Sequence, residues 1–291
     1  GAGLINYGGS FILRNVTFTD NSSVDNSGGM FTDSGSPTLE GCIFLNNLAN
    51  HGAGMVNQTG SSTTLIDCLF ENNIAHALKD PRLGGGGLYN STSDVQVINC
   101  RFIGNSANNG AGVANWSSSP TLINCLFRDN NASNYGGGAL NSSAGTQGSI
   151  PKFINCTFKD NSAGNFGGGI ADVLGIFVHG LPGNPNLINS ILWDNLDSTG
   201  KNENSQVFSD GSGLFTINSS IIQGLTGNFG DSNNSGDDPL FEDFEGRLSQ
   251  NSPAIDTGDN TAIPEGIITD LDGNPRIVNN NVDMGSYEFQ E

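Results

Sequence analysis

Aspartate recurs at one position of a repeated phrase, directly before an asparagine. The later repeats carry Asp129, Asp160 and Asp194 there. If successive repeats stack, their carboxylates lie ~5 Å apart, the separation found between the two carboxyl groups of a retaining glycoside hydrolase. That chemistry needs two different environments, whereas a stacked column gives every carboxyl the same one. If the protein is an enzyme these three are its catalytic residues; otherwise we expect them to be solvated turn aspartates.

A polysaccharide lyase would instead need basic residues to bind a uronic acid and abstract a proton. Arg128 and Lys159 are the only basic pair in register between repeats, and an aspartate follows each of them. We expect these two side chains to balance neighbouring carboxylates at the surface, which contributes ~0–1 kcal/mol.

A second set of oxygen ligands lies near the C-terminus, in the sequence TDLDGNP. Asp270, Asp272 and Asn274 alternate as calcium ligands do, and Asp283 or Asp256 would add another. The bidentate glutamate of an EF-hand is missing at the required spacing, so an Asp/Gly turn is the alternative. No cofactor is required by this reading, and Ca²⁺ is the candidate.

The cysteines occupy a single column of the repeats: Cys42, Cys68, Cys100, Cys125 and Cys156. Val16 continues the column at one end, and Ser190 and Ser219 continue it at the other. Adjacent strands are ~4.8 Å apart, which exceeds the ~3.5–4.5 Å between the Cβ atoms of a disulfide. We therefore expect free, buried thiols in a slot for small residues.

All these residues belong to a phrase repeated about seven times: an apolar residue, then Asn-Cys-x-Phe-x-x-Asn, then glycines. The closing asparagines are Asn21, Asn47, Asn73, Asn105, Asn130, Asn161 and Asn195, spaced by 26, 26, 32, 25, 31 and 34 residues. Each period has room for about three short strands. Because no segment has helical periodicity, we predict one coil per repeat in an all-β, right-handed parallel β-helix of about nine coils.

A large apolar residue recurs at one phase of the coil: Phe18, Phe44, Phe70, Phe102, Phe127 and Phe158, followed by Leu192 and Ile221. This column predicts a buried core stack, each member contributing ~1.5–3 kcal/mol. Leu39, five residues before Phe44, is also expected inside, so strict alternation must break at a bend near the residue before each Cys. The closing asparagines predict a ladder of stacked amides, since an unpaired buried amide costs ~1–3 kcal/mol.

The formal net charge of −19 comes from 29 acidic and 10 basic residues. Nucleic acids and anionic membranes require a basic patch, which is absent, and no apolar run approaches the ~18 residues of a membrane span. The opening GAGLIN matches GAGMVN at 52–57, so we expect the chain to begin within a coil of something longer.

The Phe-x-x-Asn and Gly-Gly-Ala/Leu/Ile pairing resembles the repeats of chlamydial polymorphic outer-membrane proteins and related bacterial β-helix surface proteins. The sequences DPLF (238–241), SPAIDTGDN (252–260) and TDLDGNPRIVNNNVDMGSYEFQ (269–290) are similar to the region that ends the helix in bacterial choice-of-anchor Q proteins. From the residues we expect a single-stranded, pectin-lyase-like solenoid over 1–225 and a C-terminal coil and cap over 226–291. The resemblance implies export to the bacterial surface. It supplies no catalytic residue.

These observations favour a non-catalytic extracellular or cell-surface protein for adhesion or structural assembly, with a polysaccharide-degrading hydrolase or lyase as the alternative. The expected partners are a glycan or cell-surface ligand, or copies of the chain stacked head to tail in a filament. Three insertions, at 76–83, 142–151 and 173–185, are expected to form contact loops or to pack on the flank. Candidate N-glycosylation sites include Asn15, Asn90, Asn115, Asn141 and Asn155.

Overall fold

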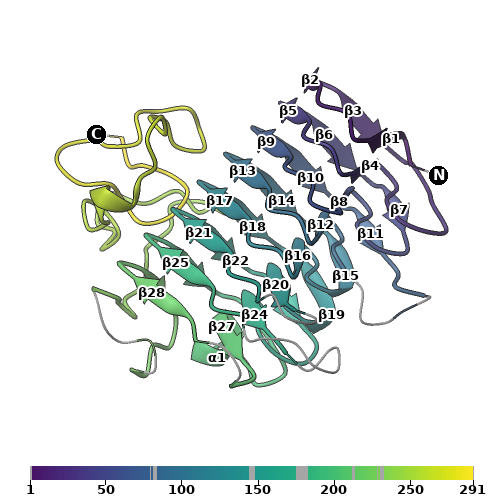
Figure 1. The fold of residues 1–291 in the computed structure, drawn as a ribbon. Helices are drawn as coiled ribbons and strands as arrows, with labels where there is room; N and C mark the ends of the chain where they lie inside the picture. The colour runs from purple at the N-terminus through teal and green to yellow at the C-terminus, as the bar shows by residue number, and fades with distance from the viewer. Residues whose placement is uncertain are drawn as a thin grey trace.

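The structure is a computed structural model that describes residues 2–78, 80, 84–143, 148–174, 183–211, 214–227, 229 and 233–290. Within these residues the chain winds through stacked coils whose strands pair in parallel with the next coil (Figure 1). Three sheets have eight strands each and a fourth has five, so the described residues make eight coils, one fewer than expected. The prediction of an all-β parallel β-helix is confirmed. Parts of the three insertions, residues 79, 81–83, 144–147 and 175–182, lie outside the described residues.

The strands fall into sheets that we call A to D. Sheet A contains β1 (Leu4–Tyr7), β4 (Met30–Asp33), β8 (Met55–Gln58), β12 (Leu88–Ser91), β16 (Val113–Trp116), β20 (Ala139–Ser142), β24 (Ile170–Asp172) and β27 (Val207–Ser209). Sheet B contains β2 (Ile12–Arg14), β5 (Thr38–Glu40), β9 (Thr64–Ile66), β13 (Gln96–Ile98), β17 (Thr121–Ile123), β21 (Lys152–Ile154), β25 (Asn186–Ile188) and β28 (Thr216–Asn218).

Sheet C contains β3 (Thr17–Thr19), β6 (Ile43–Leu45), β10 (Leu69–Glu71), β14 (Arg101–Ile103), β18 (Leu126–Arg128), β22 (Thr157–Lys159), β26 (Ile191–Trp193) and β29 (Ile221–Ile222). Sheet D contains β7 (Leu48–Ala49), β11 (Ile74–Ala75), β15 (Ser106–Asn109), β19 (Asn131–Tyr135) and β23 (Ser162–Ala163). The described helices are α1 (Glu203–Gln206) and a 3₁₀ turn, η1 (Asn260–Ala262). None of the described residues forms a helix with the length and hydrophobicity needed to cross a membrane.

A tight corner joins sheet B to sheet C in every coil. The residue at this corner has a positive φ throughout: Asn15, Gly41, Asp67, Asn99, Asn124, Asn155, Asn189 and Ser219. Asn, Asp and Gly tolerate this left-handed conformation best, which explains their prevalence there. The corner turns the chain so that Leu39 and Phe44 are both buried, and the predicted break in alternation is thus present.

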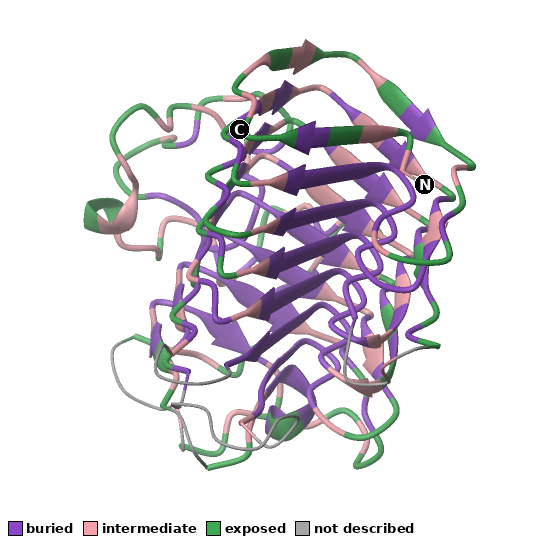
Figure 2. Ribbon diagram, turned by 45° about the vertical axis from the view of Figure 1, so that its right-hand side comes forward, coloured by how far each residue is buried: buried purple, intermediate pink, exposed green. Residues whose placement is uncertain are grey.

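The core is a file of side chains along the helix axis. Neighbouring phenylalanine rings from Phe18 to Phe158 lie parallel, with centroids 4.3–4.9 Å apart. Figure 2 shows that buried residues line the stacked strands, whereas exposed ones gather at turns and on the first coil. Leu192 continues the file, but its partner in the last coil is Ile222 and not the expected Ile221. The eighth repeat is degenerate, and its corner falls one residue later than its sequence indicates.

The C-terminal residues do not form only an end cap. Asn234 and Ser235 lie against the last coil, where Asn234 Oδ1 accepts a hydrogen bond from Ser220 N at 3.0 Å. The following residues run back along the outer face of sheet C (Figure 1, yellow). The outward residues of β18 and β26, Leu126 and Ile191, are apolar and fully buried beneath them. Covering this apolar face explains why the segment lies on the flank.

Candidate functional site

The aspartates named as candidate catalytic residues occupy a second corner, between sheets C and D. Asp129, Asp160 and Asp194 have φ values of 57°, 56° and 59°. The same corner holds Asn46, Asn72 and Gly104 in other coils, also with positive φ. Glycine has no side chain with which to do chemistry, so this column is selected for backbone conformation.

Each of these carboxylates is paired with a cation. Arg128 Nη1 lies 2.8 Å from Asp129 Oδ2, and Lys201 Nζ lies 2.8 Å from Asp194 Oδ1. Lys159 donates to Asp160 in the same way. The column therefore provides no contrast in environment that would separate an acid from a nucleophile.

The basic pair expected of a lyase is also engaged. Arg128 and Lys159 lie in register on β18 and β22. Arg128 Nη2 donates to Glu245 Oε1 at 3.0 Å, and its guanidinium lies 4.9 Å from the ring centre of Phe244. Lys159 Nζ lies 5.9 Å from the ring centre of Phe241. Both cations thus help to fix the C-terminal segment on the flank.

The closing asparagines form a continuous amide ladder from Asn21 to Asn195. Nδ2 of each one donates to Oδ1 of the next at 2.8–3.0 Å. From Asn47 onward Nδ2 also donates to the carbonyl of the core residue in the preceding coil, as Asn47 does to Phe18 O at 2.9 Å. The ladder ends on Gln206, whose Oε1 accepts from Asn195 Nδ2 at 2.7 Å. The ladder joins neighbouring coils. Its asparagines are buried, apart from Asn21, which is partly exposed.

Sequence reasoning missed a second ladder, on sheet A. Nδ2 of Asn57, Asn90 and Asn115 donates to Oδ1 of the next asparagine at 3.1, 3.0 and 2.9 Å, and the last acceptor is Asn141. Their recurrence after the glycine clusters, as in GAGMVN, GGGLYN and GAGVAN, was the signal that could have revealed it. Asp172 takes the next place, where Asn141 Nδ2 and Asp172 Oδ2 are both buried without a hydrogen-bond partner.

The prediction of glycosylation is wrong at four of the five candidate asparagines, because their side chains are buried. Asn90, Asn115, Asn141 and Asn155 are at most 1% exposed, so the folded protein has no room for a glycan on these amides. Asn15, with φ 54° at its corner, is exposed.

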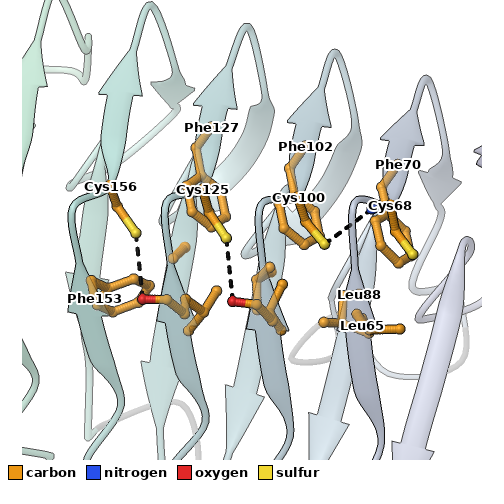
Figure 3. Close-up of a cluster of buried hydrophobic side chains, with 14 of the residues drawn as sticks. Leu65, Cys68, Phe70, Leu88, Cys100, Phe102, Cys125, Phe127, Phe153 and Cys156 are labelled. Atoms are coloured by element: carbon orange, nitrogen blue, oxygen red, sulfur yellow. Dashed lines mark hydrogen bonds between the residues drawn. The ribbon is translucent and has the colours of Figure 1, made fainter. Parts of the chain in front are cut away.

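All five thiols are free and buried. Figure 3 shows Cys68, Cys100, Cys125 and Cys156 in one column. Cys100 Sγ accepts from the Cys68 backbone N–H at 3.3 Å, and Ser190 Oγ accepts from the Cys156 N–H at 3.2 Å in the same way. The column continues to Ser220, which accepts from Ser190 N at 3.1 Å, and not to the expected Ser219. A hydrogen bond with the Cys68 thiol and burial raise the pKa of Cys42, which opposes thiolate formation.

Three of the candidate calcium ligands, Asp270, Asp272 and Asp283, accept hydrogen bonds from protein donors. Asp270 Oδ1 accepts from the backbone of Asp272 and Asn274 at 3.0 and 2.8 Å. Asp272 receives Arg247 Nε at 2.6 Å, and Asp283 accepts backbone N–H groups on both oxygens at 2.7 Å. Within the described part of the chain, no group of three or more His, Cys, Asp or Glu residues is arranged to hold a metal ion.

The C-terminal segment also encloses a buried charge that sequence reasoning did not identify. Arg276 is 1% exposed, and its Nη2 donates to the carbonyls of Asp283 and Gly285 at 2.7 and 2.8 Å. Glu288 lies beside it, with Oε2 at 4.0 Å from Arg276 Nε. Burial raises the pKa of Glu288 to about 7. This cluster fixes the fold of the segment.

A cavity of about 510 Å³ opens in the same segment. Gln250, Asp256 and Asn279 are its polar lining, and Ile255, Val278 and Phe289 are its apolar lining, with Asp283 at the buried side. No other described residue forms a hydrogen bond with the Gln250 amide. The volume lies within the ~300–1,000 Å³ of small-molecule sites.

The profile of the family described as "right handed beta helix region" matches residues 2–282. The chain belongs to this right-handed β-helix family. No curated protein matches the sequence significantly. The β-helix fold is shared by adhesins and by polysaccharide-degrading enzymes, so membership establishes architecture and leaves activity to the sites.

The two ends of this right-handed β-helix protein differ. The first coil leaves one edge of β1, β2 and β3 unpaired within the described residues, with Ile5, Tyr7 and Ile12 at 50%, 76% and 53% exposure. At the last coil, Ser235 bridges to Ile221 and Phe229 packs on Phe215 with ring centres 6.1 Å apart. Among the described residues, the first coil therefore has an open edge and the last coil a covered one.

Proposed function

We propose that this protein acts without catalysis at the bacterial cell surface, as an adhesin that presents a rigid β-helix. The observation that carries the proposal is the corner geometry of Asp129, Asp160 and Asp194. Their positive φ, and the cation beside each carboxylate, account for these residues without a reaction. The fold then serves as a stiff scaffold for contact surfaces.

Extracellular placement is supported by the resemblance of the repeats to bacterial surface proteins and of the C-terminal sequence to choice-of-anchor Q proteins. The net charge of −19 favours solubility, as a surface-displayed protein requires. A glycan or another cell-surface ligand is the partner we propose, and no cofactor is needed for such binding.

An adhesion assay combined with a turnover assay tests this function. The purified full chain is placed on a glycan array and on cells, and is incubated with neutral and uronic acid polysaccharides while reducing ends and unsaturated products are measured. We expect binding without product. Polysaccharide turnover that Asp160→Asn abolishes would establish the hydrolase alternative and overturn the proposal.

Assembly into a filament is the second candidate function. The covered last coil supports it less well than adhesion. Analytical ultracentrifugation and electron microscopy of the full chain at high concentration test it directly. We expect isolated particles, and ordered filaments would favour structural assembly over adhesion.

A further inference from the structure

We infer that the cavity between residues 250–256 and 278–289 binds a short neutral saccharide, which deepens the proposed adhesive function and rests on it. The site is formed by the described C-terminal segment and has a volume of about 510 Å³. It presents hydrogen-bonding groups and apolar groups around one space. A sugar requires both, since its hydroxyls need donors and acceptors and its C–H faces need an apolar wall.

The side chains of Gln250 and Asp256 in the cavity are available to a ligand, unlike the carboxylates of Asp270, Asp272 and Asp283. The carboxylate oxygens of these three residues accept hydrogen bonds from backbone N–H groups or from arginine. By contrast, the Gln250 amide has no hydrogen bond to a described residue. The Asp256 carboxylate receives only a long contact of 3.4 Å, from Asn279 Nδ2. An amide and a carboxylate can together donate to and accept from adjacent hydroxyls.

The apolar side of the cavity is formed by Ile255, Val278 and Phe289, which are all partly buried. Their remaining exposure allows a ligand to cover them, and covering apolar area is favourable by ~25 cal/mol per Å². An aromatic ring is a suitable surface for the C–H face of a pyranose.

Charge selects a neutral ligand over an acidic one. Asp256 and Asp283 line the cavity, and none of its described lining residues is basic. A uronic acid would bring a third carboxylate to this site, in a protein whose net charge is already −19. Like charges at such distances are unfavourable, so an acidic saccharide binds more weakly.

The backbone around the cavity is fixed before any ligand binds. Asp256 N donates to Asp283 Oδ1 at 2.7 Å, and Asn281 Nδ2 donates to Asp256 O at 3.1 Å. Asp256 and Asn279 have positive φ values of 56° and 61°, both line the cavity, and their side chains are in contact. A preorganised site loses less entropy when it binds.

Isothermal titration of the full chain with cellobiose, maltotriose, N,N′-diacetylchitobiose and digalacturonate tests the inference. Two variants address the cavity without removing a bond inside the fold: Gln250→Ala, and Asp256→Asn, which keeps a side chain suited to positive φ. Asp20→Asn is the matched control, because Asp20 is an exposed aspartate of the first coil with a positive φ of 55° and does not line the cavity.

We expect at least one neutral saccharide to bind. Both cavity variants should lower its affinity at least tenfold, whereas the control variant should bind as the parent protein does. The melting temperatures of all three variants should equal that of the parent protein. Digalacturonate should bind more weakly than the neutral saccharide. Absence of binding by all three neutral probes, equal binding by the cavity variants, or stronger binding of digalacturonate would overturn the inference. These results leave the proposed adhesion standing if the protein still binds cells, whereas polysaccharide turnover would overturn the function itself.

Discussion

Asn189 and Asp259 are joined by two hydrogen bonds, although 70 residues separate them in the sequence. Asn189 Nδ2 donates to Asp259 O at 3.0 Å, and Asp259 N donates to Asn189 Oδ1 at 2.7 Å. The corner amide thus pairs with the main chain of the C-terminal segment as a neighbouring strand would. Asn124 makes a related contact, from Nδ2 to Thr269 O at 2.8 Å.

We expect Asn189→Gly to loosen the C-terminal segment while the β-helix remains folded. Glycine accepts the positive φ of 53° at this corner, so the change removes the amide without adding backbone strain. Two lost hydrogen bonds should reduce the free energy of unfolding by about 1–3 kcal/mol. Urea denaturation measures the loss, and hydrogen exchange should increase in residues 239–290.

Asn15→Gly is the matched control for this change, because Asn15 occupies the same corner in the first coil with a φ of 54° and is exposed. It should have little effect on stability. An equal loss in both variants would mean that the corner, and not the contact with Asp259, carries the stabilisation.

The central asparagine ladder should tolerate substitution poorly. Asn73 Oδ1 accepts from the backbone and side chain of Asn47, and Asn73 Nδ2 donates to Phe44 O and Asn105 Oδ1. Asn73→Ala leaves these groups buried and unpaired in two neighbouring coils. We expect a loss of about 3–5 kcal/mol, measured by chemical denaturation. Asn21→Ala, at the partly exposed end of the ladder, should cost clearly less, and equal costs would contradict the ladder model of stability.

The sequence predicted the coils because each core position, such as Phe44 or Cys68, recurs at one phase and must be buried. It also located the corner before each Cys, where the residue is Asn, Asp or Gly. In the eighth coil the core position is Ile222, one residue after the predicted Ile221, because this repeat lacks the Cys and Phe that mark the others. Register there is set by pairing with β26, which no local pattern encodes.

The path of the C-terminal segment could not be predicted from the sequence, for a different reason. Its contacts join residues far apart in sequence, such as Thr157 Oγ1 with Ser286 N at 3.0 Å, and follow no period. The cavity at Gln250 and Phe289 arises from the same long-range packing. The sheet A ladder was missed for the opposite reason, since Asn90 and Asn115 were periodic but also fitted a glycosylation motif.

The thiols should be unreactive in the folded protein. All five cysteines are at most 1% exposed. A hydrogen bond with a neighbouring thiol, and then burial, raise the pKa of Cys42 and Cys68. Because the thiolate is the nucleophile, we expect iodoacetamide to label all five only after denaturation, as measured by mass spectrometry. Cys100→Ser should remain folded, since Ser190 already accepts the equivalent backbone hydrogen bond. Rapid labelling under native conditions would show that the core opens.

Calcium should add little stability to the C-terminal loop. The oxygens of Asp270 accept three backbone N–H groups, and Asp272 is held by Arg101 and Arg247. A cation would have to displace these donors. We expect melting temperatures in EDTA and in millimolar Ca²⁺ to agree within about 1 °C. A clear rise in Ca²⁺ that Asp272→Asn removes would instead establish the loop as a calcium site.

The buried carboxyl of Asp172 should make stability depend on pH. Burial, with a smaller effect from the Asp210 carboxylate, raises the pKa of Asp172 to about 7 in the folded protein, against 3.8 for an ordinary aspartate. A carboxyl group whose pKa is higher in the folded state makes its full contribution to the stability of the fold at pH values below its unfolded pKa. This contribution is lost as the pH rises through the folded pKa. We therefore expect the free energy of unfolding to fall between about pH 4 and pH 7.

Asp172→Asn removes this titration and continues the sheet A ladder, since Asn141 Nδ2 lacks a partner in the present structure. The variant should be more stable than the parent protein at pH 8, by roughly 2–4 kcal/mol, and nearly equal to it at pH 4. Urea unfolding at the two pH values measures the difference. Asp210→Asn is the control, because removing its charge should lower the pKa of Asp172 only slightly while the slope persists. A variant as unstable at pH 8 as the parent protein would show that Asp172 is ionised there without penalty.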